Sequence, residues 1–358
     1  MTPHLRENVA LAPLTTIGLG GPARYFVAAR SRLELDAALR WAEERRLPVQ
    51  VLGGGSNTVF ADEGFCGLVV QVARRGVRLR EESGEVLCIA QAGSEWDDVC
   101  RTAVERGLGG VECLSGIPGS VGATPVQNVG AYGQEVASTL RWVQVYERAS
   151  GRVRRLPAEE CGFGYRRSRF KGPDAGRFVI LSVALALAPG AAPHLGYREV
   201  AEQAARLGVS MLAPAEALLA VRRIVLGLRR GKAMLRDPED PNARSVGSFF
   251  LNPVVSATRL PALRAALGAA GAELPVYPAP EGVKLSAAYL IGAAGFRRGD
   301  ARGGAAISER HALALVNRGG TARDLLRLAE EIQDEVWRRF GVRLEPEPVL
   351  VPFDPRGA

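Results

Sequence analysis

Apolar residues follow two different spacings along the chain, and together these predict a mixed α/β protein. Residues 31–45 repeat apolar side chains at helical spacing, with Ser31 in the position of an N-cap. Further helices are expected at 96–106, 213–229, 257–268 and 321–340. Short runs rich in β-forming residues predict strands at 48–52, 67–72, 87–92, 141–147, 152–157 and 178–187.

Two other stretches are expected to lack helix. Residues 188–193 are predicted to be a linker or loop after a strand. Residues 343–353 contain three prolines and are predicted to be extended, because proline cannot continue a helix. We find no repeat of fixed period.

The chain has 358 residues, which is long enough for two or three domains, and a formal net charge of +8. The densest basic clusters lie at 152–155, 166–169 and 222–232. No segment resembles a nucleic-acid-binding module and aromatic residues make up only 6% of the chain, so we expect no nucleic-acid partner. A phosphorylated small molecule matches the charge better. Arginines that only cover solvated faces would explain much of the same excess.

Cysteine and histidine usage gives no metal site. The five cysteines are odd in number and lack CxxC spacing, so we expect small buried apolar side chains in a reducing compartment. The three histidines are not at ligand spacing, which disfavours a zinc enzyme or a histidine-based triad. Residues 1–8 do not resemble a secretory signal and the apolar run 179–188 is too short for a bilayer, so we expect a cytoplasmic protein without a membrane partner.

Three glycine-rich segments are candidate cofactor loops. Residues 53–57 (GGGSN) follow a strand, where glycines can turn backbone N–H groups toward a pyrophosphate. They match neither the Rossmann nor the Walker pattern, and alone they also fit a tight turn. Residues 115–123 (SGIPGSVGA) and 127–133 (QNVGAYG) are more unusual, because small residues around one proline leave backbone that a large flat ligand can lie against.

The segment 245–253 (SVGSFFLNP) is the candidate for proton chemistry. Gly247 has no Cβ and allows close approach of a bulky group, and the Phe249–Phe250 pair can exclude water. A serine between them, Ser248, could then act as a proton donor or nucleophile. Read alone, the same pattern also fits a buried strand that ends in a turn at 252–253.

These motifs, with TTIGLGGPA (15–23), LGGGSNTVF (52–60) and SGIPGSVGATPVQNVGAYG (115–133), resemble the UDP-N-acetylenolpyruvoylglucosamine reductase family. The resemblance continues through GYRRSRFK (164–171), VGSFFLNP (246–253), KLSAAYLI (284–291) and LEPEP (344–348) and covers nearly the whole chain in order. It implies a mixed α/β (α+β) protein with a two-part FAD-binding fold of the vanillyl-alcohol-oxidase (PCMH) type and a C-terminal α/β substrate-binding domain. The implied ranges are 1–70 and 71–205 for the two FAD-binding subdomains, 206–335 for the substrate-binding domain, and 336–358 for a segment that returns to the active site.

The resemblance also implies an activity. Members reduce the enolpyruvyl ether of UDP-N-acetylglucosamine to the lactyl ether, which gives UDP-N-acetylmuramate for peptidoglycan. NADPH reduces a non-covalently bound FAD, hydride passes to the vinyl carbon, and a proton is added at the neighbouring carbon. We expect a monomer. Two alternatives stay open: an FAD oxidase of the same cofactor fold, disfavoured in its covalent form because the candidate loops lack histidine, and a non-catalytic flavin-binding protein.

By the same resemblance, three residues carry the chemistry. Arg166 would stabilise the negative charge on the substrate carboxylate, and Ser248 would be the general acid. Glu347 would assist the enolate, with Glu345 as its near neighbour and competitor. The chain departs from the family at 348–349, where Pro-Val stands in place of the usual Val-Arg.

The resemblance assigns the ligand contacts as follows. The cofactor-binding residues are Gly53, Gly54, Gly55, Ser56, Asn57, Ser115, Gly116, Ile117, Pro118, Gly119, Ser120, Gly122, Ala123, Asn128, Gly130, Ala131 and Tyr132. The substrate-binding residues are Tyr165, Tyr197, Lys232 and Asn252, with Arg236 as the alternative to Lys232. Tyr197 resembles the tyrosine of the subclass with a folding substrate loop. Ala306 stands where some members have a glutamine.

Overall fold

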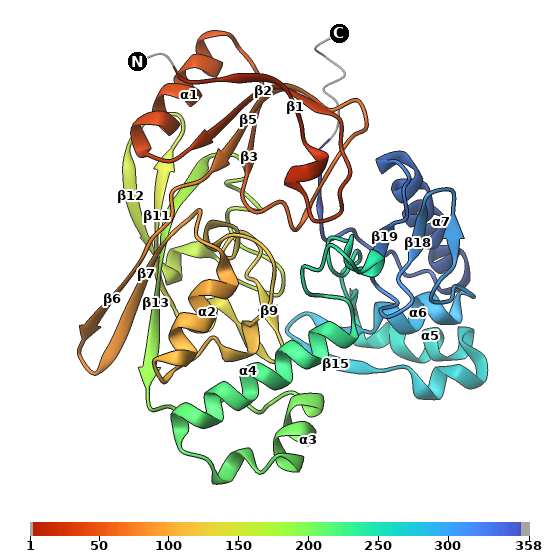
Figure 1. The fold of residues 1–358 in the computed structure, drawn as a ribbon. Coiled ribbons are helices and arrows are strands. Elements are labelled where there is room, and N and C mark those ends of the chain that lie inside the picture. The colour runs from red at the N-terminus through yellow and green to blue at the C-terminus, as the bar shows by residue number, and fades with distance from the viewer. Residues whose placement is uncertain (1–2, 352–358) are drawn as a thin grey trace. The chain divides into compact units, whose positions relative to one another are not determined.

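The computed structural model describes residues 3–351 (Figure 1). Their contacts divide the described chain into two compact units. The first unit contains residues 3–9, 23–55 and 66–236, and the second contains 10–22, 56–65 and 237–351. Two short segments near the N-terminus thus fold with the last third of the chain. The four functional ranges expected from the sequence stay a prediction, because the two units are defined by contacts within the chain and not by which residues bind FAD or substrate.

The first unit begins with a small sheet and one helix. The sheet has the order β1 (Arg6–Ala10), β2 (Pro22–Ala29), β5 (Phe65–Val72), β3 (Val49–Leu52), and β3 and β5 are parallel. Helix α1 (Arg32–Glu44) begins after Ser31, whose hydroxyl accepts a hydrogen bond from the N–H of Glu34 at 3.1 Å. Leu35, Ala38, Leu39 and Ala42 of α1 are buried in one cluster with residues of the sheet. The predicted helix at 31–45 and its N-cap are confirmed.

A second, antiparallel sheet follows, in the order β12–β11–β13–β7–β6, with β8 paired to one end of β13. Its strands are β6 (Val77–Glu82), β7 (Glu85–Gln91), β8 (Leu108–Gly109), β11 (Leu140–Glu147), β12 (Val153–Pro157) and β13 (Phe178–Pro189). Helix α2 (Trp96–Glu105) buries its apolar face in the core of this sheet. Strand β13 extends two residues beyond the predicted end, because Ala188 and Pro189 pair with β8. The predicted loop at 188–193 therefore begins two residues too early.

The first unit ends with two helices that lie side by side, α3 (Arg198–Arg206) and α4 (Pro214–Gly231) (Figure 1). Their apolar residues form a separate cluster with Cys113. The predicted helix at 213–229 is confirmed in α4. Helix α3 was not predicted, because its short, mostly polar sequence buries only Val200 and Ala204.

The second unit combines short strands with three helices around one core. Its strands are β4 (Thr58–Phe60), β14 (Val254–Val255), β15 (Val276–Ala279), β16 (Gly282–Leu285), β17 (Ala301–Arg302), β18 (Ala305–Ile307), β19 (Leu315–Asn317) and β20 (Val349–Val351). Its helices are α5 (Leu260–Ala266), α6 (Ala287–Ala293) and α7 (Ala322–Phe340). A capping box between Thr321 and Asp324 starts α7, which confirms the helix predicted at 321–340.

One prediction in the second unit needs correction. The helix predicted at 257–268 is broken into a 3-10 turn at Ala257–Arg259 and the shorter α5, because Pro261 is tolerated only in the first turn of a helix. The extended segment predicted at 343–353 is confirmed for its described part, which contains no helix and ends in β20; residues 352–353 lie outside the described part.

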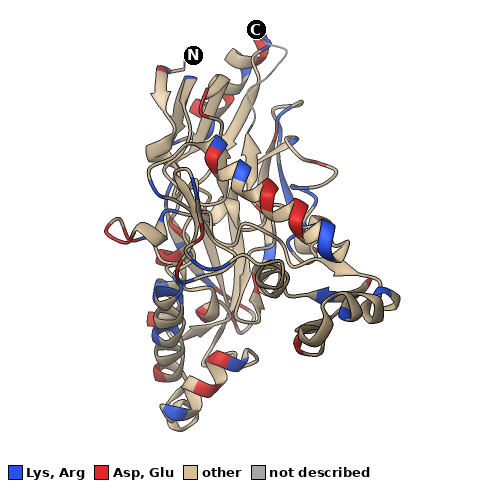
Figure 2. Ribbon diagram, turned by 90° about the vertical axis from the view of Figure 1, so that its right-hand side faces the viewer, with Lys and Arg blue, Asp and Glu red and all other residues tan. Residues whose placement is uncertain are grey.

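Figure 2 shows basic and acidic residues interspersed along the helices. Ion pairs such as Arg302–Glu331 join exposed side chains, so part of the arginine excess covers solvated faces. All five cysteines are free thiols and four of them are buried, as predicted, with the pKa of Cys88 raised by burial to about 11. Among residues 3–351, no helix is long and apolar enough to span a membrane and no His, Cys, Asp and Glu cluster could hold a metal ion.

Candidate functional site

The first two glycine-rich segments lie directly against each other. A Cβ atom added to Gly54 would lie 2.6 Å from the Cα of Gly119, and one added to Gly53 would lie 2.6 Å from the Oγ of Ser120. Glycine is therefore required at 53 and 54 by the contact between the two loops, a reason that the sequence did not give. Within the described residues, the buried Oγ of Ser120 has no hydrogen-bond partner. A buried hydroxyl without a partner is a donor available to a ligand.

Helix α2 and the residues just before the second loop fix the conformation of that loop. The N–H of Gly116 donates to Oδ1 of Asp97 at 2.6 Å, and the hydroxyl of Ser115 donates to the carbonyl of Glu112 at 2.7 Å. The N–H of Trp96 donates to the carbonyl of Gly119 at 3.0 Å. The loop thus has a defined conformation that neighbouring elements impose on it.

The third segment is held by a buried asparagine. Asn128 lies before β9 (Gly130–Ala131) and β10 (Gln134–Glu135). Its side-chain oxygen accepts the N–H of Ala137 at 3.0 Å, and its Nδ2 donates to Glu135 at 2.8 Å and to the carbonyl of Gly164 at 3.1 Å. Asn128 therefore connects a predicted cofactor segment to the segment that carries Arg166.

Arg166 lies in a tight turn between Gly164 and Arg167. Its Nη2 donates to the carbonyl of Gly130 at 2.8 Å, so the predicted catalytic arginine is in contact with the third cofactor segment. Its guanidinium also lies 5.8 Å from the ring centroid of Tyr165, which is exposed. These contacts distinguish Arg166 from a merely solvated surface arginine.

Backbone conformation singles out the same region. Within residues 3–351, seven non-glycine residues have positive φ, and three of them are predicted site residues: Asn128 (φ 46°), Tyr132 (φ 49°) and Arg166 (φ 51°). A non-glycine residue in this conformation costs about 1–3 kcal/mol, and such residues cluster at functional sites. The concentration here supports the cofactor and catalytic assignments.

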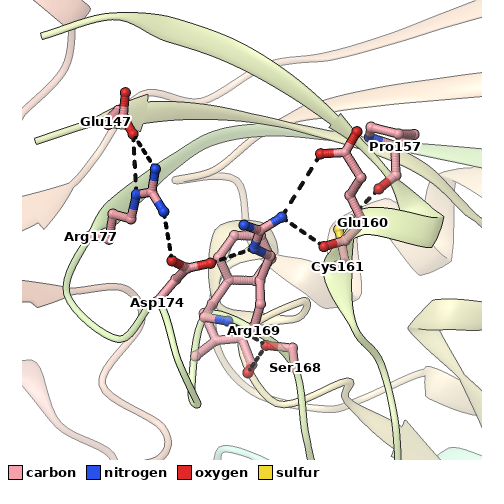
Figure 3. Close-up of polar contacts among 10 residues, drawn as sticks. Glu147, Pro157, Glu160, Cys161, Ser168, Arg169, Asp174 and Arg177 are labelled. Carbon is pink, nitrogen blue, oxygen red and sulfur yellow. Dashed lines mark hydrogen bonds and ion pairs between the residues drawn. The ribbon is translucent and has the colours of Figure 1, made fainter. Parts of the chain in front are cut away.

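An ion-pair network braces the segment after Arg166 (Figure 3). Asp174 lies between two arginines and accepts hydrogen bonds from Nε of Arg169 at 2.6 Å and from Nη1 of Arg177 at 3.0 Å. Arg177 also donates to Glu147 of β11 at 2.8 Å. The hydrogen bond from Arg169 is the main cause that holds the pKa of Asp174 below its ordinary value, and the hydrogen bond from Arg177 adds to it. Ser168 adds a hydrogen bond from its hydroxyl to the carbonyl of Val126 at 2.5 Å.

Tyr132, Tyr197 and Lys232 form a cluster in the first unit. The two tyrosine rings meet edge to face with centroids 5.3 Å apart, and Nζ of Lys232 lies 5.7 Å from the ring centroid of Tyr132. Lys232 also forms an ion pair with Glu199 of α3 at 2.7 Å. Two predicted substrate residues thus lie beside a predicted cofactor residue. Arg236, the alternative to Lys232, is exposed.

Electrostatics in this cluster follow from burial and charge. Burial raises the pKa of Tyr132, which keeps its hydroxyl neutral. For Lys232, burial lowers the pKa, but the hydrogen bond to Glu199 and the charge of that carboxylate outweigh it and raise the pKa above the ordinary value. Lys232 is therefore a cation at neutral pH, as a contact to a diphosphate requires.

Two buried charged residues in this region were missed by sequence reasoning. Glu112 accepts hydrogen bonds from the N–H of Gly110 and of His194, both at 2.8 Å, and from Gln134 at 2.7 Å. Arg229 of α4 is buried, which lowers its pKa, and its Nη2 donates to the carbonyl of Met234 at 2.8 Å.

The Nε of Arg229 has no partner within the described residues. The sequence did contain a signal for a buried arginine here, because Arg222 and Arg229 are seven residues apart and so lie on one face of a helix. That face of α4 is otherwise buried and apolar.

In the second unit, residues 249–251 run antiparallel to residues 345–347. The N–H of Glu347 donates to the carbonyl of Phe249 at 2.8 Å, and the N–H of Leu251 donates to the carbonyl of Glu345 at 2.9 Å. This register places Glu347, not Glu345, at the end of the pairing next to Ser248. Glu345 is exposed, whereas Ser248 and Glu347 are half-buried.

The backbone conformation gives a further reason for glycine at 247. A Cβ at this position would meet no described atom within 4 Å, so the approach of a bulky ligand to Gly247 stays a prediction. Gly247 has φ +79°, a left-handed conformation that side chains disfavour. Phe249 and Phe250 are both buried in the core of the unit and pack edge to face with ring centroids 5.2 Å apart.

Two predicted ligand residues have structural contacts in the second unit. The side-chain oxygen of Asn252 accepts the N–H of Ala287, the first residue of α6, at 2.9 Å. The carbonyl of Asn57 accepts the N–H of Val349 at 2.9 Å, so Asn57 is bound to the strand that follows Glu347. Ala306 is buried in β18.

Comparisons with known proteins match both halves of the chain. Residues 23–157 match the model of an FAD-binding domain, and residues 238–351 match the C-terminal domain of UDP-N-acetylenolpyruvoylglucosamine reductase. The reductase of Nocardia farcinica is 49% identical over 97% of this chain and 90% of its own length. The reductase of Thermobifida fusca is 47% identical over 98% of this chain and 99% of its own.

A solved structure agrees with these matches. The crystal structure of UDP-N-acetylenolpyruvylglucosamine reductase from Thermus caldophilus has a TM-score of 0.67 and 28% identity, over 97% of this chain and all of that one. The expected fold class, a two-part FAD-binding fold followed by a C-terminal domain, is confirmed. Because it is 47–49% identical to such reductases over nearly its full length, the chain belongs to the UDP-N-acetylenolpyruvoylglucosamine reductase family.

Proposed function

We propose that this protein is an NADPH-dependent flavoenzyme that reduces the enolpyruvyl ether of UDP-N-acetylglucosamine-enolpyruvate to UDP-N-acetylmuramate for peptidoglycan synthesis. The observation that carries the proposal is similarity to such reductases over 97–98% of the chain, at 47–49% identity. No observation favours the alternatives of an FAD oxidase or a non-catalytic flavin-binding protein, since the C-terminal reductase domain is also matched.

The residues of the first unit fit FAD. The glycine loops at 53–55 and 115–123 lie directly against each other, and the segment 128–132 contacts Arg166. Glycine-rich backbone of this kind can turn its N–H groups toward a pyrophosphate. Two buried donors without partners in the described chain, the Oγ of Ser120 and the Nε of Arg229, are suited to an anionic ligand. When bound, FAD supplies the hydride that NADPH has given to it.

Arg166 would stabilise the charge that the reduction creates. Hydride addition to the vinyl carbon leaves negative charge on the carbon beside the carboxylate, delocalised into an enolate. A fixed guanidinium that pairs with the carboxylate oxygens lowers the energy of that state. The bond to Gly130 and the left-handed turn support this role, because they hold the side chain of Arg166 in place before substrate binds.

Ser248 would donate the proton from its Oγ to the carbon beside the carboxylate, and Glu347 would assist. The antiparallel pairing of 249–251 with 345–347 supports this pair, because it makes Glu347 a backbone neighbour of the residue after Ser248. One hydride and one proton are added across the double bond, and NADPH is oxidised to NADP⁺.

The cluster of Tyr197 and Lys232 would contact the diphosphate of the substrate, with Tyr165 and Asn252 as further contacts. The charge of Lys232 and its place beside Tyr132 support this assignment. We infer a monomer that works in the cytoplasm, where NADPH and nucleotide sugars are available; size-exclusion chromatography and cell fractionation test these two points.

Stopped-flow kinetics with Ser248→Ala test the mechanism. We expect flavin reduction by NADPH within about twofold of wild type, because Ser248 takes no part in it. Flavin reoxidation by the enolpyruvyl nucleotide should slow by roughly a hundredfold to ten-thousandfold, the usual contribution of a general acid. Ser256→Ala, at an exposed serine of the same unit, is the control. Equal losses in both half-reactions would show that Ser248 is structural.

A further inference from the structure

One carboxylate, that of Asp97 at the start of α2, binds three donors from two other parts of the first unit. Its Oδ1 accepts Nη1 of Arg222 and the backbone N–H of Gly116, both at 2.6 Å. Its Oδ2 accepts Nη2 of Arg222 at 2.8 Å. The two-pronged geometry is the strong form of an arginine–carboxylate pair.

Gly116 is where this pair reaches the predicted cofactor segment. Gly116 has φ +73°, and a Cβ there would lie 2.6 and 2.7 Å from side-chain carbons of Leu235 and Leu226. Leu226 of α4 and Leu235, which follows that helix, therefore pack against one side of the Gly116 backbone, and Asp97 accepts its N–H. Residue 116 is fixed by α2 and α4 together.

The charges of the pair are stable at neutral pH. Burial would raise the pKa of Asp97, but the hydrogen bonds from Arg222 and Gly116 outweigh it and hold the pKa below the ordinary value. The side chain of Arg222 is only 10% exposed. Without Asp97, this buried guanidinium would lose its only carboxylate partner within the described chain.

We propose that Asp97 and Arg222 are positioning residues for the flavin: their ion pair fixes the N–H of Gly116 and so holds residues 115–120 in the cofactor-binding conformation before FAD arrives. This rests on the FAD site proposed above. A loop that is ordered beforehand loses less conformational entropy when a ligand binds, so the pair raises affinity for FAD without touching it.

The molecule offers matched controls for a test. Asp98 is the next residue of α2, exposed and paired with the exposed Arg101, and Arg223 is the next residue of α4 and is exposed. Asp97→Asn leaves one acceptor for which Gly116 and Arg222 must compete. Asp98→Asn makes the same chemical change on the same helix without this conflict. Arg222→Met and Arg223→Met form the second pair.

The experiment measures the dissociation constant of FAD with apoprotein prepared from each purified holoenzyme, by quenching of flavin fluorescence. We expect about a tenfold increase for Asp97→Asn and Arg222→Met, the size of a lost charge-assisted hydrogen bond. The two controls should stay within twofold of wild type. At saturating FAD, both half-reactions of the variants should stay within about threefold of wild type, because neither residue contacts the reacting atoms.

An unchanged dissociation constant in a folded Asp97→Asn apoprotein would overturn the proposal, and so would an equal increase in Asp98→Asn. A lower apoprotein melting temperature with unchanged FAD affinity would mean that the pair is only structural. If Asp97→Asn does not fold, Arg222→Lys takes its place, since it keeps the charge and loses the two-pronged geometry. An unchanged dissociation constant of FAD in this variant would likewise overturn the proposal. Failure of the proposed function is separable: wild-type protein would then bind no FAD, or would bind FAD and not reduce the enolpyruvyl nucleotide.

Discussion

Gly54→Ala tests whether the contact between the two glycine loops supports cofactor binding. The new Cβ would lie 2.6 Å from the Cα and 2.9 Å from the carbonyl carbon of Gly119, whereas ordinary contacts begin at 3.4 Å. Both contacts are to backbone, so no flexible side chain can move aside, and the loops must separate by about 1 Å. Overpacking of this kind costs typically about 1–3 kcal/mol. If the cost falls on the bound conformation, the dissociation constant of FAD increases roughly fivefold to 150-fold.

The assay is titration of apoprotein with FAD, together with the melting temperature of the apoprotein. Gly227→Ala is the control, because this glycine lies in the middle of α4 and a Cβ there meets no described atom within 4 Å. The control should bind FAD as wild type does and gain up to about 1 kcal/mol of stability from the better helix former. FAD affinity of Gly54→Ala within twofold of wild type would refute the reasoning.

Two further predictions concern the second unit. Phe249→Ala removes a fully buried ring and should lower the free energy of unfolding of that unit by about 3–5 kcal/mol, measured by urea denaturation; a loss below about 1 kcal/mol would contradict the packing described here. Hydrogen bonds from Arg338 and Arg339 lower the pKa of Glu335 to about 2. The stability that the ionised Glu335 carboxylate contributes to the folded protein should therefore be complete above about pH 4.5 and be lost as the pH falls toward 2. The difference in melting temperature between wild type and Glu335→Gln measures this contribution and should shrink over the same pH range. A difference that grows on acidification would contradict the prediction.

The sequence alone determined the elements whose signals are local. Helix α1 and its Ser31 cap, and helix α7 with Thr321 before it, were predicted because spacing and capping act within a few residues. The family and the cofactor were also predicted from the sequence, because the motifs that carry the resemblance are short stretches of neighbouring residues in a fixed order. The candidate site residues drawn from the same motifs stay predictions. Helix α3 was not predicted, since its few apolar residues stabilise a helix only once they pack against α4.

Only the tertiary structure decided which residues support the site. Asp97 and Arg222 are 125 positions apart, and nothing in either local sequence indicates that they share a hydrogen-bond network with Gly116. The buried acceptor Glu112 and the requirement for glycine at 54 are likewise visible only where distant segments meet. Motifs record the groups that chemistry needs at fixed spacing. Contacts between distant segments are set by packing, which many different sequences can satisfy, so they leave no pattern to read.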